Sequence, residues 1–297
     1  MKARSVTGDL DQSALGVTYC HEHLILDSPV IASVFPAMHL PSVDEAVAEL
    51  ATCTAVQTMV DAMPEGGRDV NRLAEISKRT GIQIISATGL HTRKYYPGHP
   101  WALTETSDQL AARFVADLVD RCGVIKFAVG PEGLDVRTRE VLEAVAITQT
   151  QTGAPILSHC EDGKLGVEQT EAMRDLGIDL GRVVLSHTDK IPDRGYHRAM
   201  LESGVSLEYD QALRHYDNPA HATAPLLSDM VAAGYADQLM LGTDGARRTL
   251  WRTLGGAPGL AYLGEEFQSI LDNHGIDQSL RRQIMVENPA RWLSFLP

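Results

Sequence analysis

Short apolar stretches alternate with stretches of helical periodicity along most of the chain. We predict that the apolar stretches are β-strands. Ile82, Ile84 and Ile85 illustrate the pattern, because a strand that is apolar on both faces suits burial on both faces. The predicted strands cover residues 16–23, 56–60, 82–87, 123–128, 155–159, 182–187, 205–209 and 238–243.

The intervening stretches carry helix signals. Ser42 and Glu45 have the spacing of a capping box, and Gly81 and Gly153 stand where helix C-termini favour glycine. One predicted helix therefore begins after Ser42, and the others cover residues 68–79, 107–121, 138–152, 166–176, 193–203 and 222–233. Residues 1–15 read as a polar lead-in, and the chain after the eighth strand is predicted to be mostly helical.

Eight strand–helix units in strict alternation indicate parallel strands joined by crossover helices. Eight such units in 297 residues predict a (β/α)8 TIM barrel, which typically takes around 250 residues. We expect residues 1–297 to form a single domain. An open, doubly wound sheet is the competing fold, but no Gly-x-Gly-x-x-Gly turn follows the first strand.

Polar side chains stand at the ends of several predicted strands, where a barrel of this kind carries its active site. Successive side chains of a strand alternate between faces, so His21 and His23 should point the same way. We expect one rim to carry His21, His23, Lys126, His159, His187 and Asp244. Imidazoles and a carboxylate at one rim suit zinc, manganese, iron or cobalt better than calcium.

Each of these residues also has a structural interpretation. His159 or His187 alone fits a hydrogen-bonded core histidine, and Asp244 alone fits a helix cap. Lys126 alone fits a buried ion pair or the Schiff-base lysine of a barrel aldolase. A metal site explains all of them together, because buried polar groups need partners.

Composition and charge limit the partners and the cellular compartment that we expect for this protein. A formal net charge of −13 argues against nucleic acid as the main partner, and no apolar run is long enough to span a membrane. The N-terminus lacks the apolar core of a secretory signal, so we expect a cytoplasmic protein. Four dispersed cysteines fit free thiols. Strand alternation should turn Cys20 and Cys160 away from the histidines, as packed thiols and not ligands.

The set of rim residues resembles the amidohydrolase superfamily. The segments that carry the resemblance look like its phosphotriesterase-related branch and run over nearly the whole chain: GVTYCHEHL at 16–24, VIK at 124–126, LSHC at 157–160, LSHTD at 185–189 and LGTD at 241–244. As a set these motifs are specific, although each alone is not.

The resemblance implies a binuclear metal-dependent hydrolase. It implies that His21, His23 and Asp244 hold the more buried metal ion and that His159 and His187 hold the more exposed one. Lys126 would bridge both as a carbamate, because a protonated ammonium cannot ligate a cation. The ions would be zinc, or else manganese or cobalt. A hydroxide bridging them would attack the substrate, and Asp244 would take its proton.

Cationic residues beyond the same strand ends suggest an anionic small-molecule substrate. Arg247 and Arg248 follow Asp244, and guanidinium groups bind phosphate or carboxylate through paired hydrogen bonds. The segment around them resembles relatives that hydrolyse phosphorylated sugar lactones. That resemblance assigns a substrate contact to Arg247, and secondarily to Arg214 and Arg248. Tyr95 or Tyr96 is expected to line the pocket.

Three alternatives stay open. The first is a phosphotriesterase, a phosphodiesterase or another carboxylic-ester hydrolase; an aromatic content of 5% leans against an organophosphate pocket. The second is a Schiff-base aldolase that uses Lys126. The third is a non-catalytic barrel. A homodimer is expected only as the commonest state of soluble oligomers.

Overall fold

All eight predicted strands are present in the computed structural model, which describes residues 1–218 and 221–296. They are β3 (Thr18–Glu22), β4 (Thr58–Asp61), β5 (Gln83–Gly89), β6 (Cys122–Val129), β7 (Ile156–Cys160), β8 (Val183–Ser186), β9 (Ser206–Tyr209) and β10 (Leu239–Leu241). Each pairs in parallel with the next along the chain. The predicted (β/α)8 barrel is confirmed. The predicted domain 1–297 includes residues 219, 220 and 297, which lie outside the described residues.

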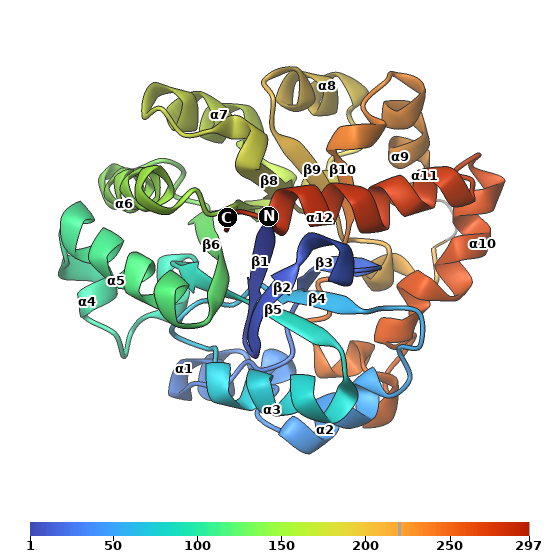
Figure 1. Cartoon of the computed structure of the whole chain (residues 1–297), viewed down its shortest axis with the longest axis horizontal. Helices are drawn as coiled ribbons and strands as arrows, with labels where there is room; N and C mark the ends of the chain where they lie inside the picture. The colour runs from blue at the N-terminus through green and yellow to red at the C-terminus, as the bar shows by residue number, and fades with distance from the viewer. Residues whose placement is uncertain (219–220, 297) are drawn as a thin grey trace.

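Helices surround the strands on the outside of the barrel (Figure 1). Those between strands are α1 (Pro29–Val34), α2 (Val43–Leu50), α3 (Val70–Thr80), α4 (Trp101–Thr104), α5 (Ser107–Asp120), α6 (Val136–Thr152), α7 (Gly166–Asp175), α8 (Arg194–Glu202) and α9 (Thr223–Ala232). After β10 come α10 (Glu266–Asn273), α11 (Gln278–Arg282) and α12 (Asn288–Leu293). Within the described ranges, no helix is both long and apolar enough to cross a membrane.

Most helix ends lie close to their predicted positions, but the predicted capping box at α2 needs a correction. Gly81 and Gly153 end α3 and α6 with φ of 76° and 68°, a backbone region that favours glycine. At α2, Ser42 Oγ accepts the backbone N–H of Glu45 at 3.2 Å. The predicted capping box is only half formed, however, because the Glu45 carboxylate accepts a hydrogen bond from Arg248 Nη1 at 3.0 Å instead.

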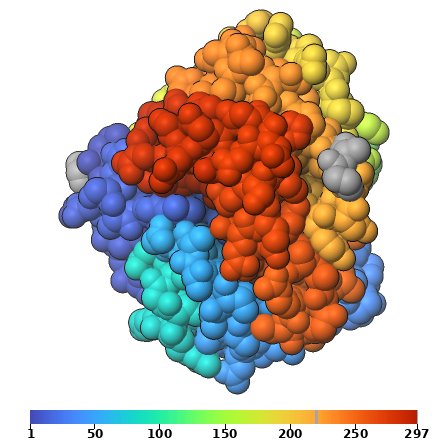
Figure 2. Space-filling model, turned by 90° about the vertical axis from the view of Figure 1, so that its right-hand side faces the viewer, coloured from blue at the N-terminus to red at the C-terminus, as the bar shows by residue number. Residues whose placement is uncertain are grey.

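The first fifteen residues are not a polar lead-in. β1 (Lys2–Ser5) and β2 (Gly8–Asp11) form an antiparallel hairpin, and β1 crosses the end of the barrel that faces the viewer in Figure 1, beside α12. Two backbone hydrogen bonds of 2.9 and 3.0 Å join Lys2 to Leu296. In Figure 2 the red C-terminal segment accordingly lies beside the blue N-terminal one. Ala3 and Leu15 are fully buried, so the hairpin closes the N-terminal end of the barrel.

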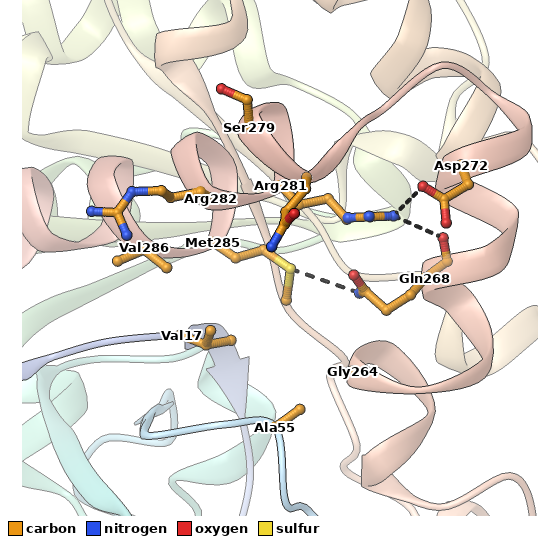
Figure 3. Close-up of a pocket in the computed structure, with 11 residues that line it drawn as sticks. Val17, Ala55, Gly264, Gln268, Asp272, Ser279, Arg281, Arg282, Met285 and Val286 are labelled. Carbon is orange, nitrogen blue, oxygen red and sulfur yellow. Dashed lines mark hydrogen bonds and ion pairs between the residues drawn. The ribbon is translucent and has the colours of Figure 1, made fainter.

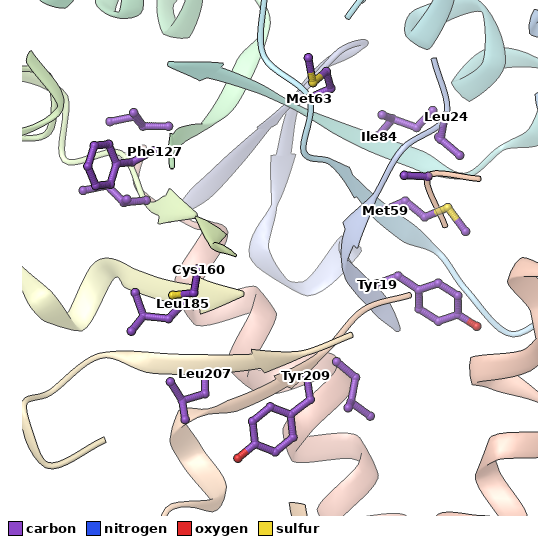
Figure 4. Packing of buried hydrophobic residues seen from close by; sticks show 14 of the residues in the cluster. Tyr19, Leu24, Met59, Met63, Ile84, Phe127, Cys160, Leu185, Leu207 and Tyr209 are labelled. Atoms are coloured by element: carbon purple, nitrogen blue, oxygen red, sulfur yellow. The ribbon is translucent and has the colours of Figure 1, made fainter. Parts of the chain in front are cut away.

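Strand alternation divides the apolar side chains into an inner and an outer cluster. The outer cluster, which packs between sheet and helices, includes Tyr19, Phe127 and Cys160 (Figure 4). The inner cluster fills the barrel below the polar rim with Cys20, Val60, Ile85, Val124, Leu157, Val184 and Met240. Both thiols are buried, but the predicted orientation is wrong for Cys20, whose Sγ lies 3.8 Å from Met240 Sδ inside the barrel. An irregular register between Tyr19 and Glu22 accounts for the difference.

The barrel closes where its last strand meets its first. The backbone N–H groups of Thr243 and Asp244 donate to the carbonyl oxygen of His21 at 3.2 and 3.0 Å. Gly242 makes this approach possible, because a Cβ added there would lie 2.8 Å from the backbone nitrogen of His21 and closer still to a Glu208 carboxylate oxygen.

We therefore expect Gly242→Ala to lower the free energy of unfolding by about 1–3 kcal/mol, the usual effect of overpacking a close-packed interior. Urea unfolding followed by circular dichroism measures the change. Gly98→Ala is the matched control, because a Cβ at Gly98 would meet nothing within 4 Å. Equal stability of the two variants would show that the strands can separate at this point without loss.

Candidate metal centre

A cavity of about 150 Å³ opens at the C-terminal ends of the barrel strands. Its described lining includes most of the residues predicted for the site: His21, His23, His159, His187, Asp244, Tyr95, Arg214 and Arg247. Lys126 is fully buried, and it lies two residues beyond the inward-facing Val124 on the same face of β6. Arg248 is not among the described residues that line this cavity.

His21, His23 and Asp244 form one compact group. Asp244 Oδ1 lies 3.4 Å from His23 Nε2 and 4.0 Å from His21 Nε2. One ligand atom from each of the three residues lies within 4.8 Å of the others, close enough to hold one metal ion. Asp61, at the end of β4, accepts the backbone N–H of Leu24 at 2.7 Å and so fixes the chain just after His23.

His159 and His187 stand beside this group. Their ring centroids are 4.5 Å apart, and the rings of His21 and His187 are 4.8 Å apart. His159 Nε2 lies 2.6 Å from Glu161 Oε2, so the free nitrogen of His159 is Nδ1. A carboxylate on the outer nitrogen of a histidine is the usual support for a metal-binding imidazole.

The buried polar atoms test whether these residues suit a metal. Nδ1 of His159 and Nζ of Lys126 are buried and have no hydrogen-bond partner in the described part of the chain. Unpartnered buried polar groups are costly, and divalent cations would satisfy these nitrogens once Lys126 is neutral or carboxylated. Burial lowers the pKa of Lys126 to about 8, which makes the neutral amine accessible near neutral pH. The donor set fits a pair of divalent ions.

Two of the candidate ligands have unusual backbone conformations. His187 has φ of 65° and Asp244 has φ of 44°, both in the left-handed region that non-glycine residues rarely adopt. Such residues cost of order 1–3 kcal/mol each and cluster at functional sites.

Four polar residues around the cavity were not among the predicted ligands. Asp210 Oδ2 lies 2.7 Å from His187 Nδ1, and Asp210 forms a second potential metal group with His21 and His187. Glu208 Oε2 lies 3.4 Å from His21 Nδ1. His91 and Glu161 line the cavity itself. All four stand at or just after a strand end, the signal that identified the other residues.

The carboxylates of this cluster have divergent pKa values. Burial, with Asp210 next to it, raises the pKa of Glu208 well above its usual range. Burial would also raise the pKa of Asp244, but the nearby Arg214, His23 and His187 hold it well below its usual range. Asp244 is therefore ionised at neutral pH, the form that ligates a metal.

The predicted substrate residues differ in their surroundings. Arg247 is exposed at the cavity, whereas Arg248 is tied to Glu45 of α2. Arg214 Nη2 lies 2.6 Å from Asp244 Oδ2. Tyr95 is 5% exposed and packs edge-on against His91. Tyr96 is not among the described lining residues.

A larger groove of about 770 Å³ lies elsewhere, between the C-terminal helices and two segments of the chain that contain Val17 and Ala55 (Figure 3). Its polar groups are already paired in part: Arg281 Nη1 donates to Asp272 Oδ1 at 2.6 Å. Its described lining includes none of the candidate ligands at the barrel rim. The cavity at the strand ends, although smaller, is the one with convergent ligands.

Known proteins resemble this chain over almost its full length. A phospho-furanose lactonase of Mycoplasmopsis synoviae is 28% identical, with 99% of this chain and 92% of the relative covered. An aryldialkylphosphatase of Saccharolobus solfataricus is 24% identical, covering 96% and 97%. The crystal structure of a lactonase from Listeria monocytogenes superimposes with a TM-score of 0.93 at 26% identity, covering all of both chains. The sequence pattern of the Phosphotriesterase family matches residues 1–293, and the chain belongs to that family.

Proposed function

We propose that this protein is a metal-dependent hydrolase of ester bonds and that its substrate is a lactone carrying an anionic group, such as a phosphorylated sugar lactone. The relatives named lactonase and aryldialkylphosphatase support hydrolysis of esters. The likeness to a phospho-furanose lactonase supports a phosphorylated lactone in particular.

The proposal of an anionic substrate depends on two cationic side chains that have no partner among the described residues. Arg247 and Lys190 both line the cavity and are exposed. Within residues 1–218 and 221–296 neither side chain makes a hydrogen bond or ion pair, although most exposed arginines of this chain do. Two free cations at one mouth of a protein with net charge −13 favour an anionic ligand there.

The candidate ligands divide naturally between two ions. His21, His23 and Asp244 would hold one, His159 and His187 would hold the other, and Lys126 would join them as its carbamate. When bound, such ions supply Lewis acidity and a water nucleophile at neutral pH.

The protein's own groups orient the reaction. Arg214 binds Asp244 through both its carboxylate at 2.6 Å and its backbone carbonyl at 2.9 Å. These two contacts support a role for Arg214 in orienting Asp244, rather than the substrate contact inferred from the sequence. Asp244, so held, would accept the proton of the attacking water and pass it to the alcohol oxygen that leaves.

The Lys126→Met variant tests the metal site. Methionine keeps the apolar stem but cannot form a carbamate, so metal content should fall below two ions per chain and kcat/KM should fall more than about 100-fold. Elemental analysis and lactone hydrolysis measure both, and circular dichroism checks folding. Lys164→Met, at a solvent-exposed lysine after β7, is the control. Two bound ions with full activity in Lys126→Met would refute the assignment.

A separate measurement on the wild-type protein tests whether Lys126 forms a carbamate. Chelated wild-type protein should regain metal faster in bicarbonate than in buffer freed of carbon dioxide, and faster above pH 8 than below it. The sign follows from the Lys126 pKa of about 8, because only the neutral amine that forms above it reacts with carbon dioxide. Reconstitution that ignores bicarbonate would argue against a carbamate.

The Arg247→Ala variant tests the anion site. We expect kcat/KM to fall more than about tenfold on γ-lactones that bear a phosphate, equivalent to about 1.4 kcal/mol of transition-state binding, and to fall less on the same lactones without it. Arg198→Ala, which removes an exposed charge from α8, is the matched control. Equal losses on both lactone sets would remove the phosphate from the proposal. Faster hydrolysis of paraoxon than of any lactone would favour the phosphotriesterase alternative.

A further inference from the structure

A histidine with no role in the proposed metal site forms part of the cavity wall. His91 follows β5, and its ring centroid lies 4.7 Å from those of both Tyr95 and His159. The backbone N–H of His91 donates to Tyr96 Oη at 2.9 Å, which anchors this part of the loop. His91 is therefore held in place next to a proposed metal ligand.

Hydrogen bonds at His91 Nδ1 determine which ring nitrogen carries the proton. The backbone N–H of Thr92 donates to Nδ1 at 2.7 Å, and the Thr92 hydroxyl lies 3.1 Å from the same atom. A backbone N–H can only donate, so Nδ1 must be the acceptor. The ring is then neutral, and its single proton is on Nε2.

The other ring nitrogen of His91 is open. Among the described residues Nε2 has no hydrogen-bond partner, and it is not one of the enclosed atoms that lack one. His91 lies between two spaces and lines both of them. Thr92, which donates to Nδ1, lines the small neighbouring hollow, whereas Tyr95 and His159, which flank the ring, line the metal cavity. The wall of the cavity thus presents a neutral N–H donor of fixed tautomer.

We infer that His91 determines specificity by donating a hydrogen bond from Nε2 to a hydroxyl oxygen of the substrate. The inference rests on the proposed function, since it concerns the lactone bound at that site. A site built to hydrogen-bond a substrate hydroxyl discriminates against the analogue that lacks it, because the donor is then left without a partner. His91 would therefore select a hydroxylated lactone, of the kind derived from a sugar, over its deoxy analogue.

The kinetic test compares γ-butyrolactone with its 2,3-dihydroxy derivative. His91→Phe keeps a flat ring beside Tyr95 but removes the donor, whereas His91→Gln keeps an N–H donor of similar reach. We expect His91→Phe to lower the ratio of kcat/KM for the dihydroxy lactone to that for γ-butyrolactone at least tenfold. His91→Gln should lower this ratio less than threefold. His274→Phe, at the end of α10, is the control and should leave the ratio unchanged. An unchanged ratio in His91→Phe, or an equal loss in both His91 variants, would overturn the inference.

A second measurement does not depend on turnover. Long-range ¹H–¹⁵N spectra of the metal-loaded protein, with His91 assigned by its absence in His91→Phe, should show the proton on Nε2. The Nε2 signal should shift when the ring-opened dihydroxy acid is added, and shift less with the ring-opened acid of γ-butyrolactone. A proton on Nδ1, or equal shifts with both acids, would overturn the inference. If no lactone is hydrolysed but these spectra are as expected, the proposed function fails and the hydrogen bond of His91 stands.

Discussion

The hydrogen bonds between the first and last barrel strands are the contact on which the site depends. The backbone carbonyl of His21 accepts hydrogen bonds from two backbone N–H groups of the turn after β10, and this brings Asp244 to within 4.0 Å of both His21 and His23. More than two hundred residues separate the two segments in the chain. Without closure, Asp244 would belong to the free edge of an open sheet, and the group of candidate ligands that it forms with His21 and His23 would not exist.

Burial shifts the pKa values of the ionisable groups around this closure. Burial raises the pKa of Glu22 to about 8 and lowers that of Lys126 to about 8, so each of these groups is pushed toward its neutral form. Glu22 is held by the Thr243 hydroxyl, and Asp61 is held by backbone N–H groups of the chain after His23. Lys126 has no such partner among the described residues.

The loop after β10 shows how the same barrel can serve different substrates. Glu49 of α2, fully buried, accepts the backbone N–H groups of Arg252, Thr253 and Leu260 at 3.2, 2.9 and 2.9 Å. These contacts fix the loop from outside the barrel and leave Arg247 exposed at the cavity. A relative named phospho-furanose lactonase and one named aryldialkylphosphatase both match this chain over nearly its full length. Specificity within such a family resides in its loops, because the barrel itself is common to all members.

The order of the residues was enough to predict the barrel, because eight strand–helix alternations leave few other topologies, and it located the polar residues at the strand ends. It also determined family membership, since the motifs span the whole chain. Which polar residues meet, however, depends on contacts across the whole fold. Glu45 pairs with Arg248 across the fold rather than capping its own helix, and Cys20 turns inward at an irregular strand register. Asp210 and His91 carried the same strand-end signal as the predicted ligands. Their surroundings, however, come from residues far along the chain, and spacing in one segment contains no information about those contacts.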